Sequence, residues 1–177
     1  IANIFKIPDL RNKILFVLGI FVIFRIFAAI PIPGIDQNAL AVFLEGNALF
    51  GFLDIFSGGA LSRLSVVMLG LGPYITASII LQVMTMISPR LKEIYYESGS
   101  EGRAKFSRLT RYLTVPLAAA QGFGFLNLLI AQGILAPMSV FDMAVNVLII
   151  TTGAMILVWL GELITEQKIG NGISMLI

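Results

Sequence analysis

Long apolar runs, separated by short polar or basic stretches, dominate the hydrophobic pattern of this chain. Four runs reach the length of about 20 residues that an α-helix needs to cross the hydrocarbon core of a membrane. They occupy residues 14–32, 64–88, 109–131 and 142–161, and a further apolar stretch opens at 173–177. The pattern predicts an all-α polytopic membrane protein with four transmembrane helices and the start of a fifth helix. Because the fifth run is cut short, we expect a truncated protein or a fragment.

The composition supports a membrane location and narrows the available chemistry. Of the 177 residues, 58% are hydrophobic and 12% are charged, with a mean hydropathy of +0.94, whereas soluble domains carry about 25% charged residues. The chain has no Cys and no His, which excludes zinc sites, iron–sulfur clusters, disulfides, thiol nucleophiles and histidine bases within it. We therefore expect no metal, no cofactor and no catalytic site. The net charge of +2 is too small to indicate nucleic-acid binding.

Lys and Arg residues are distributed unevenly among the loops, and cytoplasmic loops of membrane proteins carry the excess of such residues. Basic residues precede the first apolar run, cluster between the second and the third, and are absent from Tyr112 to Gln167. This distribution predicts a cytoplasmic N-terminus and four crossings. The expected cytoplasmic segments are 1–13, 89–108 and 162–172, and the expected external segments are 33–63 and 132–141.

The second apolar run is preceded by an interruption. A short apolar piece, residues 49–56, leads into Ser-Gly-Gly at 57–59, and the long run begins only after Arg63. Within hydrocarbon, irregular backbone is tolerated only where it is buried in protein or faces a water-filled cavity, and an arginine facing lipid is costly. One interpretation is a re-entrant half-helix inside an aqueous vestibule. The other is an external turn, with Arg63 as the interfacial anchor of the second span.

Four motifs carry a specific resemblance to one family. They are "IPIPGID" at 30–36, "FSGGALSRLSVVMLGLGPYITASIILQ" at 56–82, "EGRAKFSRLTRYLT" at 101–114 and "WLGELITEQKIGNGIS" at 159–174. In order and spacing they resemble the N-terminal half of the bacterial SecY family, the channel-forming subunit of the Sec translocon. The resemblance implies ten transmembrane helices in two pseudo-symmetric halves, of which this sequence covers the first. It also implies a channel that translocates unfolded secretory polypeptides and releases membrane helices laterally into the membrane.

The resemblance further implies roles for particular residues. The half-helix around the Ser-Gly-Gly motif would be the plug that closes the resting channel. The plug residues would be Leu49, Phe50, Phe52, Leu53, Ile55, Phe56, Ser57, Gly58, Gly59, Ala60, Leu61 and Arg63. A ring of aliphatic side chains at the channel waist would be matched by Leu71, Ile75, Ile173 and Ile177. Thr76 and Gln121 would face the lateral gate, through which signal sequences and membrane helices reach lipid.

The spacing of the ring residues is consistent with this role. The four residues form two i, i+4 pairs, Leu71 with Ile75 and Ile173 with Ile177, so each pair projects from one helix face. A ring of aliphatic side chains can close a pore to ions and water by dewetting. Ordinary packing between helices would explain the same spacing without the family match.

By the same resemblance, the expected partners are the subunits SecE and SecG and, on the cytoplasmic face, the SecA motor or the ribosome. Signal sequences, translocating polypeptides and the lipid bilayer complete the expected contacts. The expected location is the cytoplasmic (inner) membrane, with multiple passes and a cytoplasmic N-terminus.

Two other functions remain as alternatives. Half of an inverted-repeat secondary transporter would also contain broken helices, but the only carboxylates in the apolar spans are Asp142 and Glu162, at or beside the ends of the fourth span. An enzyme is disfavoured, because "GSEGRAK" at 99–105 lacks the spacing of a phosphate-binding loop. Arg25, inside the first span, is either functional or a structural partner of backbone carbonyls or of a carboxylate such as Glu162. Pro73 can bend the second span.

Overall fold

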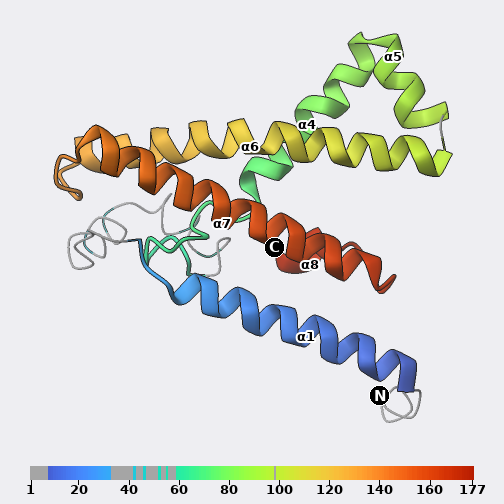
Figure 1. The fold of residues 1–177 in the computed structure, drawn as a ribbon, viewed down its shortest axis with the longest axis horizontal. Helices are drawn as coiled ribbons and strands as arrows, with labels where there is room; N and C mark the ends of the chain where they lie inside the picture. The colour runs from blue at the N-terminus through green and yellow to red at the C-terminus, as the bar shows by residue number, and fades with distance from the viewer. Residues whose placement is uncertain are drawn as a thin grey trace.

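The computed structural model describes residues 8–32, 59–97 and 99–177, together with the single residues Val42, Gly46, Phe52 and Ile55. Most of these residues are in helices, and the two longest helices run antiparallel. The helices are α1 (Pro8–Ala29), α4 (Gly72–Ile87), α5 (Pro89–Lys92), the π-helix η2 (Glu93–Glu97), α6 (Gly99–Ala131), α7 (Val140–Glu166) and α8 (Gly172–Leu176). Helices α6 and α7 run side by side, and α8 lies against the C-terminal half of α7 (Figure 1).

Three of the described helices are long and apolar enough to cross a membrane. They are α1, the part of α6 from Glu101 to Ala131, and α7. Helix α4 has 16 residues and is therefore about 24 Å long, shorter than the ~30 Å of a hydrocarbon core. Helix α6 has 33 residues and is about 50 Å long, so one end of it extends beyond the hydrocarbon.

The predicted basic loop at 89–108 is helical in the described residues. Helices α5 and η2 and the first turns of α6 form a hairpin, which extends from the end of α4 (Figure 1). Tyr95 packs on Phe106 across this hairpin, with ring centroids 4.6 Å apart. The basic composition of this segment therefore gave no information on its local structure.

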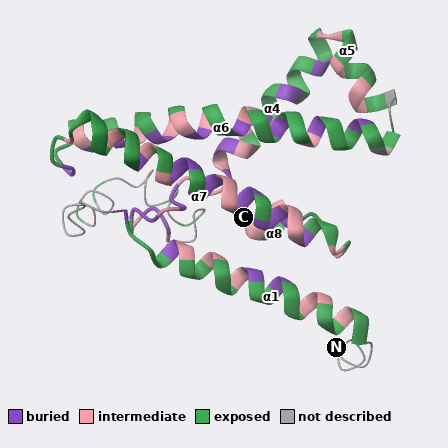
Figure 2. Cartoon of the chain, viewed as in Figure 1, coloured by how far each residue is buried: buried purple, intermediate pink, exposed green. Residues whose placement is uncertain are grey.

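Two apolar clusters hold the described residues together, and α7 contributes to both. The first gathers Val17 and Ile20 of α1, Leu71 before α4, and Leu157, Leu160 and Ile164 of α7. The second joins Leu64 and Met68 to Leu126 and Leu129 of α6 and to Ile150 of α7. Buried residues therefore recur along α7, whereas α1 is largely exposed (Figure 2).

Four of the predicted elements correspond to helices with shifted ends. Residues 14–32 fall largely within α1, 109–131 within α6 and 142–161 within α7, and the start of a fifth helix at 173–177 overlaps α8. The predicted span 64–88 differs from the structure, because its first eight residues are turns and one isolated bridge. Pro73 is in the first turn of α4, where a proline fits the helix without a lost hydrogen bond. It begins the helix and does not bend a span.

Candidate functional site

The segment from Gly59 to Leu71 is folded but not helical. Pro31 and Ser65 form an isolated antiparallel bridge, in which the Ile32 amide donates to the Leu64 carbonyl (2.9 Å) and the Val66 amide donates to the Ile30 carbonyl (3.1 Å). Leu64 has a positive φ of 42°, a conformation that non-glycine residues rarely adopt. The segment therefore pairs with the end of α1 before α4 begins.

This irregular segment is buried in protein. Leu64, Ser65 and Val67 are at most 1% exposed. The carbonyl of Val66 lies so close to α7 that a Cβ added at Gly153 would be 1.9 Å from its oxygen. Burial against protein is the condition under which non-helical backbone is tolerated at membrane depth.

Two of the predicted ring residues lie at the start of α4. Leu71 occupies the N-cap position, and its side chain makes no capping hydrogen bond, since it has no polar atom. Its side chain is 5% exposed, whereas that of Ile75 is 37% exposed. Leu71 is therefore packed in the cluster to which α7 contributes, whereas the side chain of Ile75 is exposed at the surface.

Of the other two ring residues, Ile173 lies on α8 and Ile177 directly follows it. The Asn171 side chain caps this helix by accepting from the amides of Ile173 and Ser174. Gly172 lies directly on α7, because an added Cβ would be 2.0 Å from the Gly161 carbonyl oxygen. Ile173 is half-buried, and Ile177 is 54% exposed.

Residues at the starts of α4 and α8 pack in one apolar cluster, to which α7 also contributes. Leu71 belongs to the first apolar cluster, and Ile173 packs against that cluster. Leu160 and Ile164 of α7 are among its buried members. Ile75 and Ile177 are exposed. One residue of each i, i+4 pair thus anchors its helix and the other is accessible.

The predicted plug residues are only partly within the described residues. Leu49, Phe50, Leu53, Phe56, Ser57 and Gly58 lie outside them. Phe52 and Ile55 are 58% and 76% exposed. Gly59 has a positive φ of 79°, Ala60 and Leu61 are buried, and Arg63 is exposed.

Arg63 and Arg25 line the same cavity. Its volume is about 310 Å³, and the other lining residues are Ala28, Ala29, Gly59 and Ser62. Arg25 lies near the C-terminal end of α1 and Glu162 near that of α7. The Glu162 carboxylate pairs with Arg111 of α6.

The two predicted gate residues are on neighbouring helices. Thr76 is half-buried on α4, and its hydroxyl donates to the Gly72 carbonyl (3.0 Å). Gln121 is half-buried on α6, the helix that packs against α4. The structure describes no contact between the side chains of Thr76 and Gln121.

Sequence reasoning missed a polar cluster where α4, α6 and α7 meet. The Arg111 guanidinium of α6 donates to both carboxylate oxygens of Glu162 on α7, each at 2.5 Å. On α4, Tyr74 lies near Ser107 and Arg111 of α6 and near Glu162 of α7. In the sequence, Arg111 belongs to the basic residues that cluster between the second and the third apolar run. Arg111 lies two residues into the apolar run 109–131, and a charge inside such a run was the only indication in the sequence that it has a partner within the fold.

Among the residues that the structure describes, no three His, Cys, Asp or Glu side chains gather where they could hold a metal ion. The described polar groups instead serve helix contacts and caps. One example is Thr165, which accepts from the Gly172 amide and donates to the Gly161 carbonyl, both at 2.9 Å. The site is therefore a meeting point of helices around α7.

Comparison with known proteins identifies the family. A sequence model of the SecY family matches residues 65–177, which is more than half of the chain. The chain belongs to the SecY family. The match begins inside the irregular segment and includes α4, the polar cluster and α8. SecY membership and three described helices of spanning length make the chain a multi-pass membrane protein.

Relatives match over nearly the whole chain. The protein translocase subunit SecY of Streptomyces scabiei is 46% identical over 99% of this chain and 43% of its own length. The subunit of the same name from Corynebacterium glutamicum is 42% identical over 100% of this chain and 43% of its own length. That of Mycobacterium bovis is 43% identical over 96% of this chain and 41% of its own length. The chain thus spans less than half the length of the SecY relatives it matches.

Proposed function

We propose that this chain forms the N-terminal half of a protein-conducting channel in the cytoplasmic membrane. The observation that carries the proposal is the SecY match over residues 65–177, together with relatives named as protein translocase subunits that align with nearly the whole chain. The channel passes unfolded secretory polypeptides and releases membrane helices into lipid. It performs no catalysis, and its driving force comes from an external motor or the ribosome. The transporter alternative finds no support among these relatives.

The channel constriction in this proposal consists of Leu71, Ile75, Ile173 and Ile177, with further members from the other half. The proposal draws support from Leu71, directly before α4, and Ile173 of α8, which pack in or against the same apolar cluster. The exposed Ile75 and Ile177 provide the accessible surface, and the buried neighbours fix their helices. Aliphatic side chains close such a constriction by dewetting and adapt around a polypeptide without specific hydrogen bonds.

The remaining parts of the proposal concern the plug, the gate and the partners. Residues from about Leu49 to Arg63 form the plug, and Thr76 and Gln121 face the lateral gate. The N-terminus is cytoplasmic. SecE and SecG are the membrane partners, and SecA or the ribosome docks on the cytoplasmic side. The position of Thr76 and Gln121 on two packed helices is compatible with one side of a gate.

A cysteine crosslinking experiment tests the function. The chain has no cysteine, so a single Cys replaces Ile75 in a full-length SecY that contains this sequence and is otherwise cysteine-free. A stalled translocating polypeptide with one thiol is then offered under oxidising conditions. We expect a disulfide at Ile75→Cys, because this side chain is 37% exposed, whereas Leu71 is 5% exposed.

The matched control is Leu148→Cys on α7, whose side chain is 66% exposed. In the proposed channel Leu148 faces lipid, and no disulfide is expected there. Equal crosslinking at both positions, or none at Ile75 and Ile177 while translocation proceeds, would contradict the assigned path of the polypeptide.

A further inference from the structure

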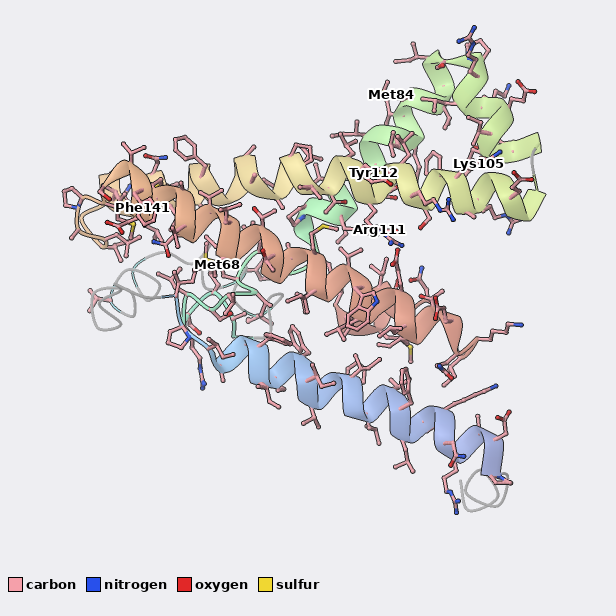
Figure 3. The ribbon with its side chains drawn as sticks, in the orientation of Figure 1. Met68, Met84, Lys105, Arg111, Tyr112 and Phe141 are labelled. Carbon is pink, nitrogen blue, oxygen red and sulfur yellow. The ribbon has the colours of Figure 1, made fainter. Side chains whose placement is uncertain are left out.

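The ion pair between Arg111 and Glu162 connects two long apolar helices. The guanidinium reaches both carboxylate oxygens at 2.5 Å, a charge-assisted contact to the whole carboxylate. The Glu162 side chain is 19% exposed and that of Arg111 is 44% exposed. Figure 3 shows Arg111 extending from α6 towards α7. This pair differs from an exposed surface pair, because its carboxylate is largely removed from solvent.

Tyr74 brings α4 into the same cluster. Its side chain packs against the first apolar cluster, and it lies near Ser107, Arg111 and Glu162. Tyr74 lies between Leu71 and Ile75 in the first turns of α4. The ion pair therefore lies near the turn that carries two of the proposed constriction residues.

The same part of α7 holds α8. Gly161 precedes Glu162, and an added Cβ at Gly161 would be 3.0 Å from the Ile173 side chain. The Thr165 hydroxyl bridges the Gly161 carbonyl and the Gly172 amide. Since Glu162 lies within this turn, the ion pair anchors the backbone on which α8 begins.

We propose that Arg111, Glu162 and Tyr74 form a clasp that positions the first turns of α4 and α8 and thereby sets the width of the resting constriction. The inference rests on the proposed channel function and concerns the regulation of that site. In this proposal Arg111 and Glu162 are positioning residues, which act through the helix turns that they hold. Opposite charges that join two helices resist separation, because each partner would be left with an unpaired charge.

If the clasp sets the width of the resting constriction, its loss should open the resting channel to ions. Arg111→Ala leaves a largely buried carboxylate without its counter-charge, and the α7 turn must shift to rehydrate it. A dewetting constriction responds strongly to small changes of radius. We expect the ion leak per resting channel to rise at least about fivefold, the lower range for coupling between sites. Tyr74→Phe, which keeps the ring and removes the hydroxyl, raises the leak in the same direction.

The experiment measures ion flux through the resting full-length channel, assembled with its membrane partners in lipid vesicles and normalised to the amount of folded channel. The variants are Arg111→Ala, Tyr74→Phe and the charge exchange Arg111→Glu with Glu162→Arg. The exchange conserves net charge and restores the attraction, so the leak returns to within about twofold of the parent. The matched control removes an exposed pair on the same helix, Glu101→Gln with Lys105→Met, whose atoms are 2.8 Å apart. This control leaves the leak unchanged.

The outcomes separate the clasp from the channel function. An unchanged leak in both single variants, or a raised leak that the charge exchange does not reduce, overturns the clasp. Should Arg111→Ala fail to fold, Tyr74→Phe and the charge exchange give the same decision. Crosslinking at Ile75→Cys is measured on the same preparations. If it succeeds while the leak is insensitive to the clasp variants, the channel function stands and the clasp is wrong. If it fails at Ile75 and Ile177 in the parent while translocation proceeds, the proposed path itself is wrong.

Discussion

Helices α1 and α7 are both apolar enough to span a membrane, yet they occupy different environments. In the most apolar window of α1, 17% of residues are buried, against 44% in α7. Helix α1 contributes three buried residues, Val17, Ile20 and Ala28. Helix α7 is contacted by α1, α6 and α8. Hydropathy therefore identifies a span but does not tell whether protein or lipid surrounds it.

Helices α7 and α1 differ because α7 contains small residues at which the backbone of neighbouring segments can approach closely. Gly153 and Gly161 of α7 are in direct contact with Val66 and Ile173, whereas Gly19 of α1 has no atom within 4 Å of an added Cβ. Small residues allow close approach of backbone between membrane helices, where van der Waals packing drives association. Helix α7 thus acts as the centre of the described fold and α1 as its periphery.

The largest expected effect comes from Gly153→Ala. Its Cβ would meet the Val66 carbonyl oxygen at 1.9 Å and the carbonyl carbon at 2.7 Å, and neither atom belongs to a flexible side chain. We expect a loss of about 3 kcal/mol or more, at the upper end of the cost of overpacking. The thermal stability of the purified full-length channel in detergent measures it.

Gly19→Ala in α1 is the matched control. With open space around its Cβ, the substitution should be neutral or should stabilise by up to about 1 kcal/mol, because glycine is unfavourable inside helices. Equal stability of the two variants would remove the proposed distinction between α1 and α7.

A smaller effect is expected from shortening a leucine in each helix. Leu157 of α7 is 1% exposed and Leu18 of α1 is 51% exposed. Leu157→Ala should cost about 2 to 3 kcal/mol through lost contacts and a residual cavity, whereas Leu18→Ala should change stability by less than about 0.5 kcal/mol. Thermal unfolding of the two variants side by side checks this. A larger loss at Leu18 would show that α1 is covered by protein in the full channel.

The smallest effect concerns the charge pair of α1. Lys13 and Asp9 lie 3.2 Å apart at side-chain exposures of 34% and 80%. Asp9→Asn should therefore alter stability by less than about 0.5 kcal/mol, as exposed pairs usually do. Unfolding curves of this variant at low and at high salt measure the effect. A clear, salt-dependent loss would place α1 under stronger electrostatic constraint than its exposure indicates.

The sequence predicted the long helices well and the start of α4 poorly. Residues 109–131 and 142–161 lie within α6 and α7, because long apolar runs have few alternatives to a helix in a membrane. The run from Leu64 to Leu71 is equally apolar, but its backbone pairs with Ile30–Ile32, a long-range contact that leaves no local trace. Gly70, with a φ of 55°, and Pro73 were the local signals that a helix starts there.

The sequence likewise predicted only part of the candidate site. Motif spacing assigned the four constriction residues to two helix faces, but it did not tell that Leu71 is packed and Ile75 is open. Glu162 stood out as a carboxylate beside a span, and Arg25 was an available partner. Only the antiparallel arrangement of α6 and α7 places Arg111 beside Glu162, 51 positions away.

The sequence by itself determined the membrane class, the approximate spans and the family, because these depend on composition, run length and motif order. The tertiary structure decided which apolar surfaces face protein, where α4 begins and which charges pair. The physical reason is that lipid and protein interior are equally apolar. Hydrophobicity therefore drives a segment into the membrane, while shape and polar contacts between distant residues decide its neighbours there.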